Sequence, residues 1–306
     1  MTIGDHLETF AGYRVLPWEP GDALADPATH IHRIALDYDE ERSWVEKFRT
    51  FLSQPGARDT RGLVVGVWHS EMVMDNPPVD VVEAIVSARG ELPNLRALFI
   101  GDITFEESEI SWISQTDLSP ILNAYPDLEH LGVRGGNDLS LGSVRLPSLR
   151  TLVIQSGGLD ASVVREVMNA HLPNLEHLEL YFGAEEYGAT ATPEDVTPLL
   201  SGTLFPKLRY LGLRDSDRAD EYAQVVANAP VMEHLDVLDL SLGTLSDDGA
   251  RALLESPFVR GLRRLDVHHH WCSDETVERL RGLGIDVDAS DQQDLTEDWR
   301  FVAIGE

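Results

Sequence analysis

The chain of 306 residues has little cysteine and no long apolar run. Its one cysteine, Cys272, excludes an internal disulfide framework and favours a reducing compartment. No stretch of eighteen or more apolar residues occurs, so a membrane-spanning helix is not expected. The first residues, MTIGDHLETFAG, lack a basic segment followed by an apolar one, the pattern of a secretory signal. We therefore expect a cytoplasmic protein.

Basic residues are also scarce, and the only lysines are Lys47 and Lys207. Against 24 Lys and Arg stand 53 Asp and Glu, which gives a formal net charge of −29 at pH 7. Such a surface repels nucleic-acid phosphates and anionic lipid headgroups, so we expect neither nucleic acid nor a membrane as a partner. The acidity has two interpretations: a general bias toward soluble acidic surfaces, or attraction for a basic partner.

Catalytic motifs are missing as well. The sequence contains no G-x-S-x-G, no P-loop, no G-x-G-x-x-G and no H-E-x-x-H. We therefore predict no catalytic residues, no cofactor and no enzymatic activity.

What the chain does contain is a repeated segment of the form L-x-x-L-x-L. Its last two apolar positions alternate as in a strand with one buried face. Weaker copies at 31–36, 62–67 and 285–287 bring the number to about ten. The first leucine of each clear copy is Leu95, Leu128, Leu149, Leu175, Leu208, Leu235 or Leu262.

Between these segments, apolar residues change to helical spacing. Asp160, Thr192 and Ser273 precede such runs, in the place of N-caps. Only the unit from Leu128 to Leu149 is too short for a full helix. The helical runs cover residues 44–52, 82–86, 164–172, 222–226 and 250–254.

Strand, loop, helix and return at this period predict an α/β right-handed solenoid. Parallel strands line its concave face and helices its convex face. We expect a single domain over residues 1–306, with residues 29–287 forming the repeats. Residues 1–28 form an N-terminal cap and residues 288–306 a C-terminal cap, in which the alternation around Phe301 favours a short strand.

The strand register nominates side chains that point into the concave side. An aromatic patch leads to a middle zone with arginines and then to an acidic end. Exposed Trp, Tyr and Arg dominate interface energies, so we predict a non-catalytic scaffold that binds an unknown protein or peptide here. Flat sheet faces also favour aromatics without any partner, and the oligomeric state stays open. The predicted contact residues are Trp68, Phe99, Arg134, Tyr181, Tyr210, Arg214, Asp239, Asp266 and His268.

The stretch LRRLDVHHHWCSD (262–274) raises the question of a metal or thiol site. Aligned with the repeat, His268 projects from the concave face and His269 lies at the turn. His270 points inward to loop backbone groups, and Cys272 takes a buried apolar position as an inert thiol. The three imidazoles therefore aim apart and cannot chelate one ion together.

Two metal alternatives remain. Asp239, Asp266 and His268 share the concave face, with Asp288 nearby, and are suitable ligand types. Residues 286–297 also match a calcium loop in part, but the sixth position carries Asp291 instead of glycine. The partly matching ligands are Asp286, Asp288, Ser290, Asp294 and Glu297.

The strand–helix units over residues 30–288 resemble the ribonuclease-inhibitor-like leucine-rich repeat proteins, which implies a protein-binding horseshoe. The segments MTIGDHLETFAG and DWRFVAIGE are similar to those of an uncharacterised bacterial family of cytoplasmic single-domain repeat proteins. Genes of that family often neighbour those of radical-SAM and hydrolase-like proteins. The resemblance implies a modified peptide or a neighbouring enzyme as partner and brings no catalytic residues.

Overall fold

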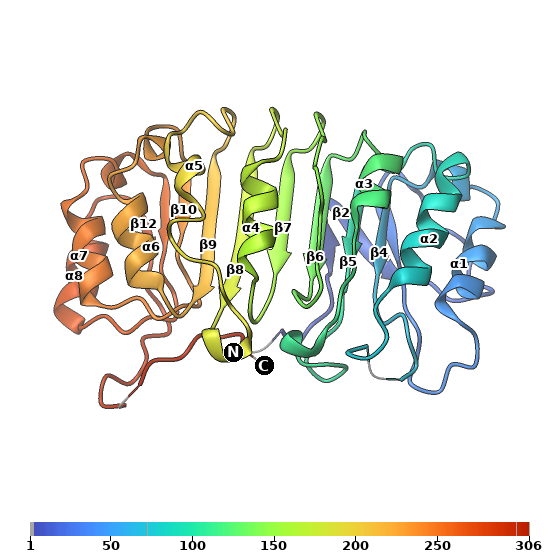
Figure 1. Cartoon of the computed structure of the whole chain (residues 1–306), viewed down its shortest axis with the longest axis horizontal. Coiled ribbons are helices and arrows are strands. Elements are labelled where there is room, and N and C mark those ends of the chain that lie inside the picture. Colours follow the sequence, from blue (N-terminus) through green and yellow to red (C-terminus); the bar gives the residue numbers. More distant parts are fainter. Residues whose placement is uncertain (1–2, 72, 298, 306) are drawn as a thin grey trace.

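The computed structural model describes residues 3–71, 73–297 and 299–305. Within them, one sheet of twelve strands runs through the molecule in chain order, from β1 to β12. β1 (Thr9–Phe10) pairs antiparallel with β2 (Tyr13–Pro17), and each later pair of neighbours is parallel. Helices cover one side of this sheet (Figure 1). The predicted α/β solenoid is confirmed.

The strands that follow are short and regularly spaced. They are β3 (His30–Ile34), β4 (Gly62–Val65), β5 (Ala97–Ile100), β6 (His130–Arg134), β7 (Thr151–Gln155), β8 (His177–Gly183), β9 (Tyr210–Ser216), β10 (Val237–Asp239), β11 (Arg264–Asp266) and β12 (Asp286–Asp288). The helices are α1 (Trp44–Leu52), α2 (Val79–Ser87), α3 (Ser119–Ala124), α4 (Ala161–Met168), α5 (Thr197–Leu200), α6 (Ala219–Val226), α7 (Asp247–Glu255) and α8 (Asp274–Arg281).

The repeated leucines form the core between the sheet and the helices. In β7, Leu152 and Ile154 are buried, whereas Thr151, Val153 and Gln155 on the opposite face are half-buried. This is the alternation that a strand with one face in the core requires. No helix lies between β6 and β7 among the described residues, as the short repeat predicts.

The helix starts follow capping chemistry. Asp160 accepts a hydrogen bond from the Ser162 N–H, and Ser273 accepts one from the Thr276 N–H, so both predicted N-caps are confirmed. The predicted start at Thr192 is wrong for the α-helix. Its N–H and hydroxyl bind the Asp195 carboxylate in a preceding turn, and α5 begins only at Thr197.

The first repeats differ from the predicted register by two residues. The repeat copy at 62–67 predicts Val65 and Val67 as the core pair, but Leu63 and Val65 pair with Leu98 and Ile100. A slip of two residues keeps every side chain on its face, so alternation alone cannot detect it. Trp68 therefore lies beyond the end of β4. It is buried, with its indole N–H donating to the Asn76 carbonyl at 2.8 Å, so its predicted place on the exposed concave face is wrong.

The N-terminal segment crosses the concave side of the first strands. The Leu7 N–H donates to Asp102, and the Phe10 ring meets the Phe99 ring edge-on with centroids 5.5 Å apart. Phe10, Val15, Ile31, Val64, Ala97 and Phe99 form a second apolar cluster. The prediction that Phe99 is exposed is wrong, because this segment covers it.

The C-terminal segment runs back past the ends of several strands (Figure 1). The Phe301 ring packs edge-on against Trp271, with centroids 5.1 Å apart. The Ala303 N–H donates to the Leu242 carbonyl, and the Ile304 N–H donates to Asp215. Residues 299–305 contain no strand, so the expected terminal strand is not formed. No helix in the described ranges has the length and apolar character needed to cross a membrane.

Candidate functional site

Parallel pairing lines up side chains in rows across β8 to β12. The first row consists of paired residues on neighbouring strands: His177, Tyr210, Val237, Arg264 and Asp286. The second row consists of Glu179, Gly212, Asp239, Asp266 and Asp288. We define the concave polar surface as the polar members of these two rows together with Arg214 and His268, which lie two residues further along the chain than Gly212 and Asp266: His177, Glu179, Tyr210, Arg214, Asp239, Arg264, Asp266, His268, Asp286 and Asp288. Several of them were not in the predicted contact set (His177, Glu179, Arg264, Asp286 and Asp288), although the strand register places them on this face.

Arg214 is the centre of this surface. Its Nη1 atom lies 3.1 Å from Oε2 of Glu179, and its Nε atom lies 3.3 Å from Oδ2 of Asp239. Burial opposes ionisation of Glu179, but hydrogen bonds and charge from His177 and Arg214 lower its pKa below the ordinary value. The guanidinium is therefore held between two carboxylates and is only partly accessible.

Tyr181 lies beneath this guanidinium. The Arg214 Cζ atom is 4.8 Å from the centre of the Tyr181 ring, and Tyr181 is 5 % exposed. The prediction that Tyr181 is an accessible contact is therefore wrong, because Arg214 covers its face.

Tyr210 closes the network. Its hydroxyl donates to Oδ2 of Asp239 at 2.6 Å, and its ring stacks on His177 with centroids 3.9 Å apart. His177 in turn bonds Glu179 at 2.6 Å. Each side chain is fixed by its neighbour, so this part of the surface is preorganised.

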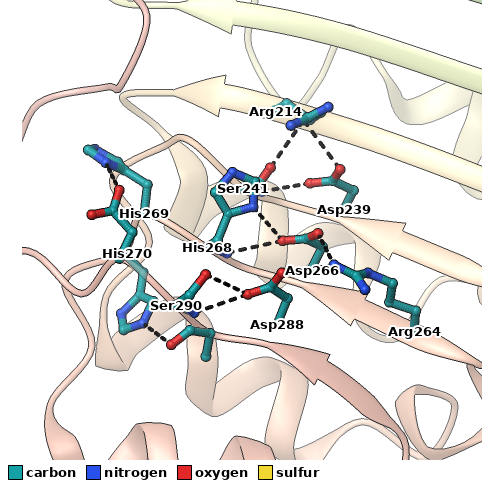
Figure 2. Close-up of polar contacts among 12 residues, drawn as sticks. Arg214, Asp239, Ser241, Arg264, Asp266, His268, His269, His270, Asp288 and Ser290 are labelled. Atoms are coloured by element: carbon teal, nitrogen blue, oxygen red, sulfur yellow. Dashed lines mark hydrogen bonds and ion pairs between the residues drawn. The ribbon is translucent and has the colours of Figure 1, made fainter. Parts of the chain in front are cut away.

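The acidic end is arranged around Arg264, as Figure 2 shows. Its Nη2 atom lies 2.9 Å from carboxylate oxygens of both Asp266 and Asp288. Nδ1 of His268 lies 2.7 Å from Oδ1 of Asp266. Burial opposes ionisation of Asp266, but the hydrogen bonds from His268 and Arg264 outweigh it and hold its pKa at about 2. The same bond raises the pKa of His268.

The candidate metal ligands that the structure brings together differ from the predicted set. Ligand atoms of Asp266, His268 and Asp288 lie within 4.8 Å of one another. Asp239, a member of the predicted set, instead points its carboxylate at Arg214 and Tyr210. It is only 3 % exposed, so the prediction that Asp239 is an accessible contact is wrong, because these two side chains bind its carboxylate. Asp266 and Asp288 already share the Arg264 guanidinium, so a cation at this place has to displace it.

The candidate ligands of the partial calcium loop bind different partners within the chain. Asp286 and Asp288 lie on β12 and bind Arg264, whereas Asp294 accepts hydrogen bonds from Thr296.

The three histidines aim apart, as the alignment predicts. His268 faces the concave side, and His269 adopts a left-handed turn with φ 58° and bonds Asp291. His270 is buried: its Nδ1 accepts from the Cys272 N–H, so Nε2 carries the proton toward the Ala289 carbonyl. Burial raises the pKa of the Cys272 thiol to about 12, which makes it inert at neutral pH.

Arg134 does not belong to the accessible surface. Its side chain is 2 % exposed, and it donates to the Ile103 carbonyl at 2.6 Å and to Gln155 at 2.8 Å. The buried Asp102 carboxylate lies 3.7 Å away and also binds Arg33 at 2.8 Å. The prediction that Arg134 is exposed is wrong, because a buried acid that no periodicity marks draws it inward.

No protein-family model and no curated protein matches the chain. Among solved structures, the chain is 34 % identical to a protein from Bacteroides fragilis, with a TM-score of 0.83 over 90 % of this chain and 77 % of that one. An internalin from Listeria monocytogenes is 14 % identical, with a TM-score of 0.41 over 86 % of this chain and 67 % of that one. A leucine-rich repeat protein from Leptospira interrogans is 14 % identical, with a TM-score of 0.44 over 91 % and 59 %.

The L-x-x-L-x-L strands, the parallel sheet and the helices on its other side form a leucine-rich repeat fold. The 34 % sequence identity to the Bacteroides fragilis protein extends over most of both chains. The chain therefore belongs to the leucine-rich repeat proteins, in the family that includes this Bacteroides fragilis protein.

Proposed function

We propose that this protein is a non-catalytic scaffold that binds a protein or peptide on the concave polar surface over β8 to β12. One observation carries the proposal: Arg214 is held over Tyr181 by Glu179 and Asp239 in a fixed, partly accessible arrangement. Side chains that are already ordered lose less conformational entropy on binding. A preorganised surface of aromatic and charged groups is therefore suited to recognition.

The charge of the surface indicates the kind of partner. Carboxylates of Glu179, Asp239, Asp266, Asp286 and Asp288 outnumber the guanidiniums of Arg214 and Arg264. Complementary charge accelerates association and selects partners. A basic segment on the partner fits the surplus of negative charge.

Parts of this surface remain open to solvent. The side chains of Arg264 and Asp288 are 40 % and 32 % exposed. By contrast, Trp68, Phe99 and Arg134 are buried, so the proposed surface leaves out the N-terminal half of the sheet.

Two valine substitutions test the proposal. Val153 lies on the concave face of β7 beside Glu179, whereas Val225 lies on α6 and is 36 % exposed. Val153→Arg places a bulky charge at the surface, and Val225→Arg places the same group on the convex side. We expect the wild type and V225R to recover the same partner from the native lysate, and V153R to lose it with its circular dichroism unchanged. Equal recovery by both variants contradicts the proposal.

Metal binding by Asp266, His268 and Asp288 is the alternative that the geometry supports less, because the Arg264 guanidinium already binds two of the three ligands. Melting with and without a chelator, together with elemental analysis, separates the two functions. A bound metal and a lower melting temperature in chelator favour the alternative.

A further inference from the structure

A second surface lies at the other end of the sheet, where the loops after β3, β4 and β5 enclose a hollow of about 680 Å³. The described residues of these loops are 35–43, 66–71 with 73–78, and 101–118, whereas the β7–α4 and β10–α7 loops span only 156–160 and 240–246. Figure 1 shows the longer loops extending beyond the strands at the end that carries α1 and α2. Long loops in a compact repeat commonly carry function. We call this feature the rim hollow.

Aromatic side chains gather in the rim hollow. Tyr38 is 94 % exposed, and Phe105 and Trp112 are each 44 % exposed. Trp112 lies on the short 3-10 helix η3 (Ile110–Trp112), where the buried neighbours Ile110 and Ile113 fix its outward direction. Exposed apolar side chains scattered singly need no explanation, but a group of three in one hollow marks a contact site.

The charge of the rim hollow is of one sign. It is lined by Asp37, Glu71, Glu106, Glu107 and Glu109, and no lysine or arginine is among its lining residues. Glu107 is bound by His6 and Arg33. For the other four carboxylates, the described residues provide no ion pair.

Carboxylates and open aromatic faces recognise the same chemistry. A guanidinium or ammonium group is attracted to the face of an aromatic ring and to carboxylates. The volume exceeds that of one side chain and suits several residues of a peptide.

The base of the hollow is fixed. The Phe105 N–H donates to the Ile3 carbonyl, and the Thr104 N–H donates to Glu107. The rim hollow is therefore held in place by the same N-terminal segment that covers Phe99.

We propose that the rim hollow binds a basic peptide segment, with an arginine or lysine side chain placed among Tyr38, Phe105 and Trp112. This site is separate from the concave polar surface and goes beyond the function proposed for it.

The test uses the full chain and a fluorescein-labelled pentapeptide of alternating arginine and leucine, at about 0.15 M salt to screen diffuse attraction. The same peptide with glutamate in place of arginine is the first control. We expect fluorescence anisotropy to show binding of the arginine peptide and no binding of the glutamate peptide. Trp112→Ala, and the double change Glu106→Gln with Glu109→Gln, should each raise its Kd by about tenfold or more.

Matched variants separate this site from the general acidity. Glu275→Gln with Glu278→Gln removes the same charge from exposed positions of α8, and Trp299→Ala removes a tryptophan that is 77 % exposed. Both should leave the Kd within about twofold.

Three outcomes overturn the proposal. They are no binding of the arginine peptide, equal weakening by the two glutamate pairs, and loss of binding in V153R but not in W112A. The last outcome moves the peptide to the concave polar surface, whereas failure of V153R to lose its lysate partner bears only on that surface. Circular dichroism of each variant confirms that it is folded.

Discussion

The guanidinium of Arg214 lies over the ring of Tyr181, with its Cζ atom 4.8 Å from the ring centre. This contact joins β8 to β9 and removes Tyr181 from solvent. The same contact gives Arg214 a role in stabilising the fold, so a substitution of Arg214 affects the free energy of unfolding as well as any contact with a partner.

Arg214→Ala is expected to destabilise the fold by about 3 kcal/mol, because it leaves the buried carboxylate of Asp239 and the largely buried carboxylate of Glu179 without their counter-charge. Urea unfolding at pH 7 measures the change. Arg251→Ala is the matched control: Arg251 is exposed on α7 and pairs with Asp248, so its loss should change stability little. Similar effects of the two substitutions would show that the Arg214 network does not stabilise the fold.

Phe10→Ala is expected to destabilise the protein by about 3 to 5 kcal/mol, because it opens a cavity over Phe99. Phe105→Ala removes the same side chain from a position that is 44 % exposed and serves as the control. Thermal melting of both variants decides the matter. A loss for F105A as large as that for F10A contradicts the assignment of Phe10 as a cover of the sheet.

The sequence predicts the solenoid because each strand repeats a local pattern. The spacing of Leu128, Leu149 and Leu175 predicts three successive strands. Asp160 and Ser273 predict the starts of two helices, because their side chains can cap a helix N-terminus. Burial between sheet and helices follows directly from that alternation.

The exposed surface is harder to predict because it depends on contacts distant in sequence. Phe99 is buried by Phe10 of the N-terminal segment, and Arg134 is drawn inward by Asp102, an acidic residue that the L-x-x-L-x-L pattern does not include. The prediction for Trp68 is wrong for a different reason. A shift of the strand register by two residues preserves the alternation of buried and exposed side chains, so the sequence pattern does not reveal it. Arg214, Asp239, Asp266 and His268 lie on the concave side as predicted, since the later strands have clear leucines.

The titration of His268 tests the Asp266 contact. The hydrogen bond to Asp266 raises the pKa of His268, so Asp266→Asn should lower it toward the ordinary value. Because the folded pKa is the higher one, the stabilisation is complete below the unfolded value of about 6.5 and is lost as the pH rises through the folded pKa. NMR titration of the imidazole protons gives the pKa, and an unchanged pKa in D266N would refute the pairing.

Asp215 is buried beside the C-terminal segment. Burial raises its pKa well above the ordinary value, although its Oδ1 atom accepts a hydrogen bond from the Ile304 N–H. A raised folded pKa in an acid means that stability falls as the pH rises above the unfolded value of about 3.9. Asp215→Asn keeps the acceptor and removes the charge, so it should weaken this pH dependence and gain stability at pH 7 relative to pH 4.5. Urea unfolding at both values checks this, and equal losses at both would contradict it.

The most direct test of the concave polar surface is a hydroxyl-radical footprint of the protein with and without the partner that it captures. If the partner binds this surface, binding protects Tyr210 and His268 from oxidation and leaves the oxidation of Trp299 unchanged. Protection confined to the convex helices, with Tyr210 and His268 oxidised as in the free protein, would contradict it.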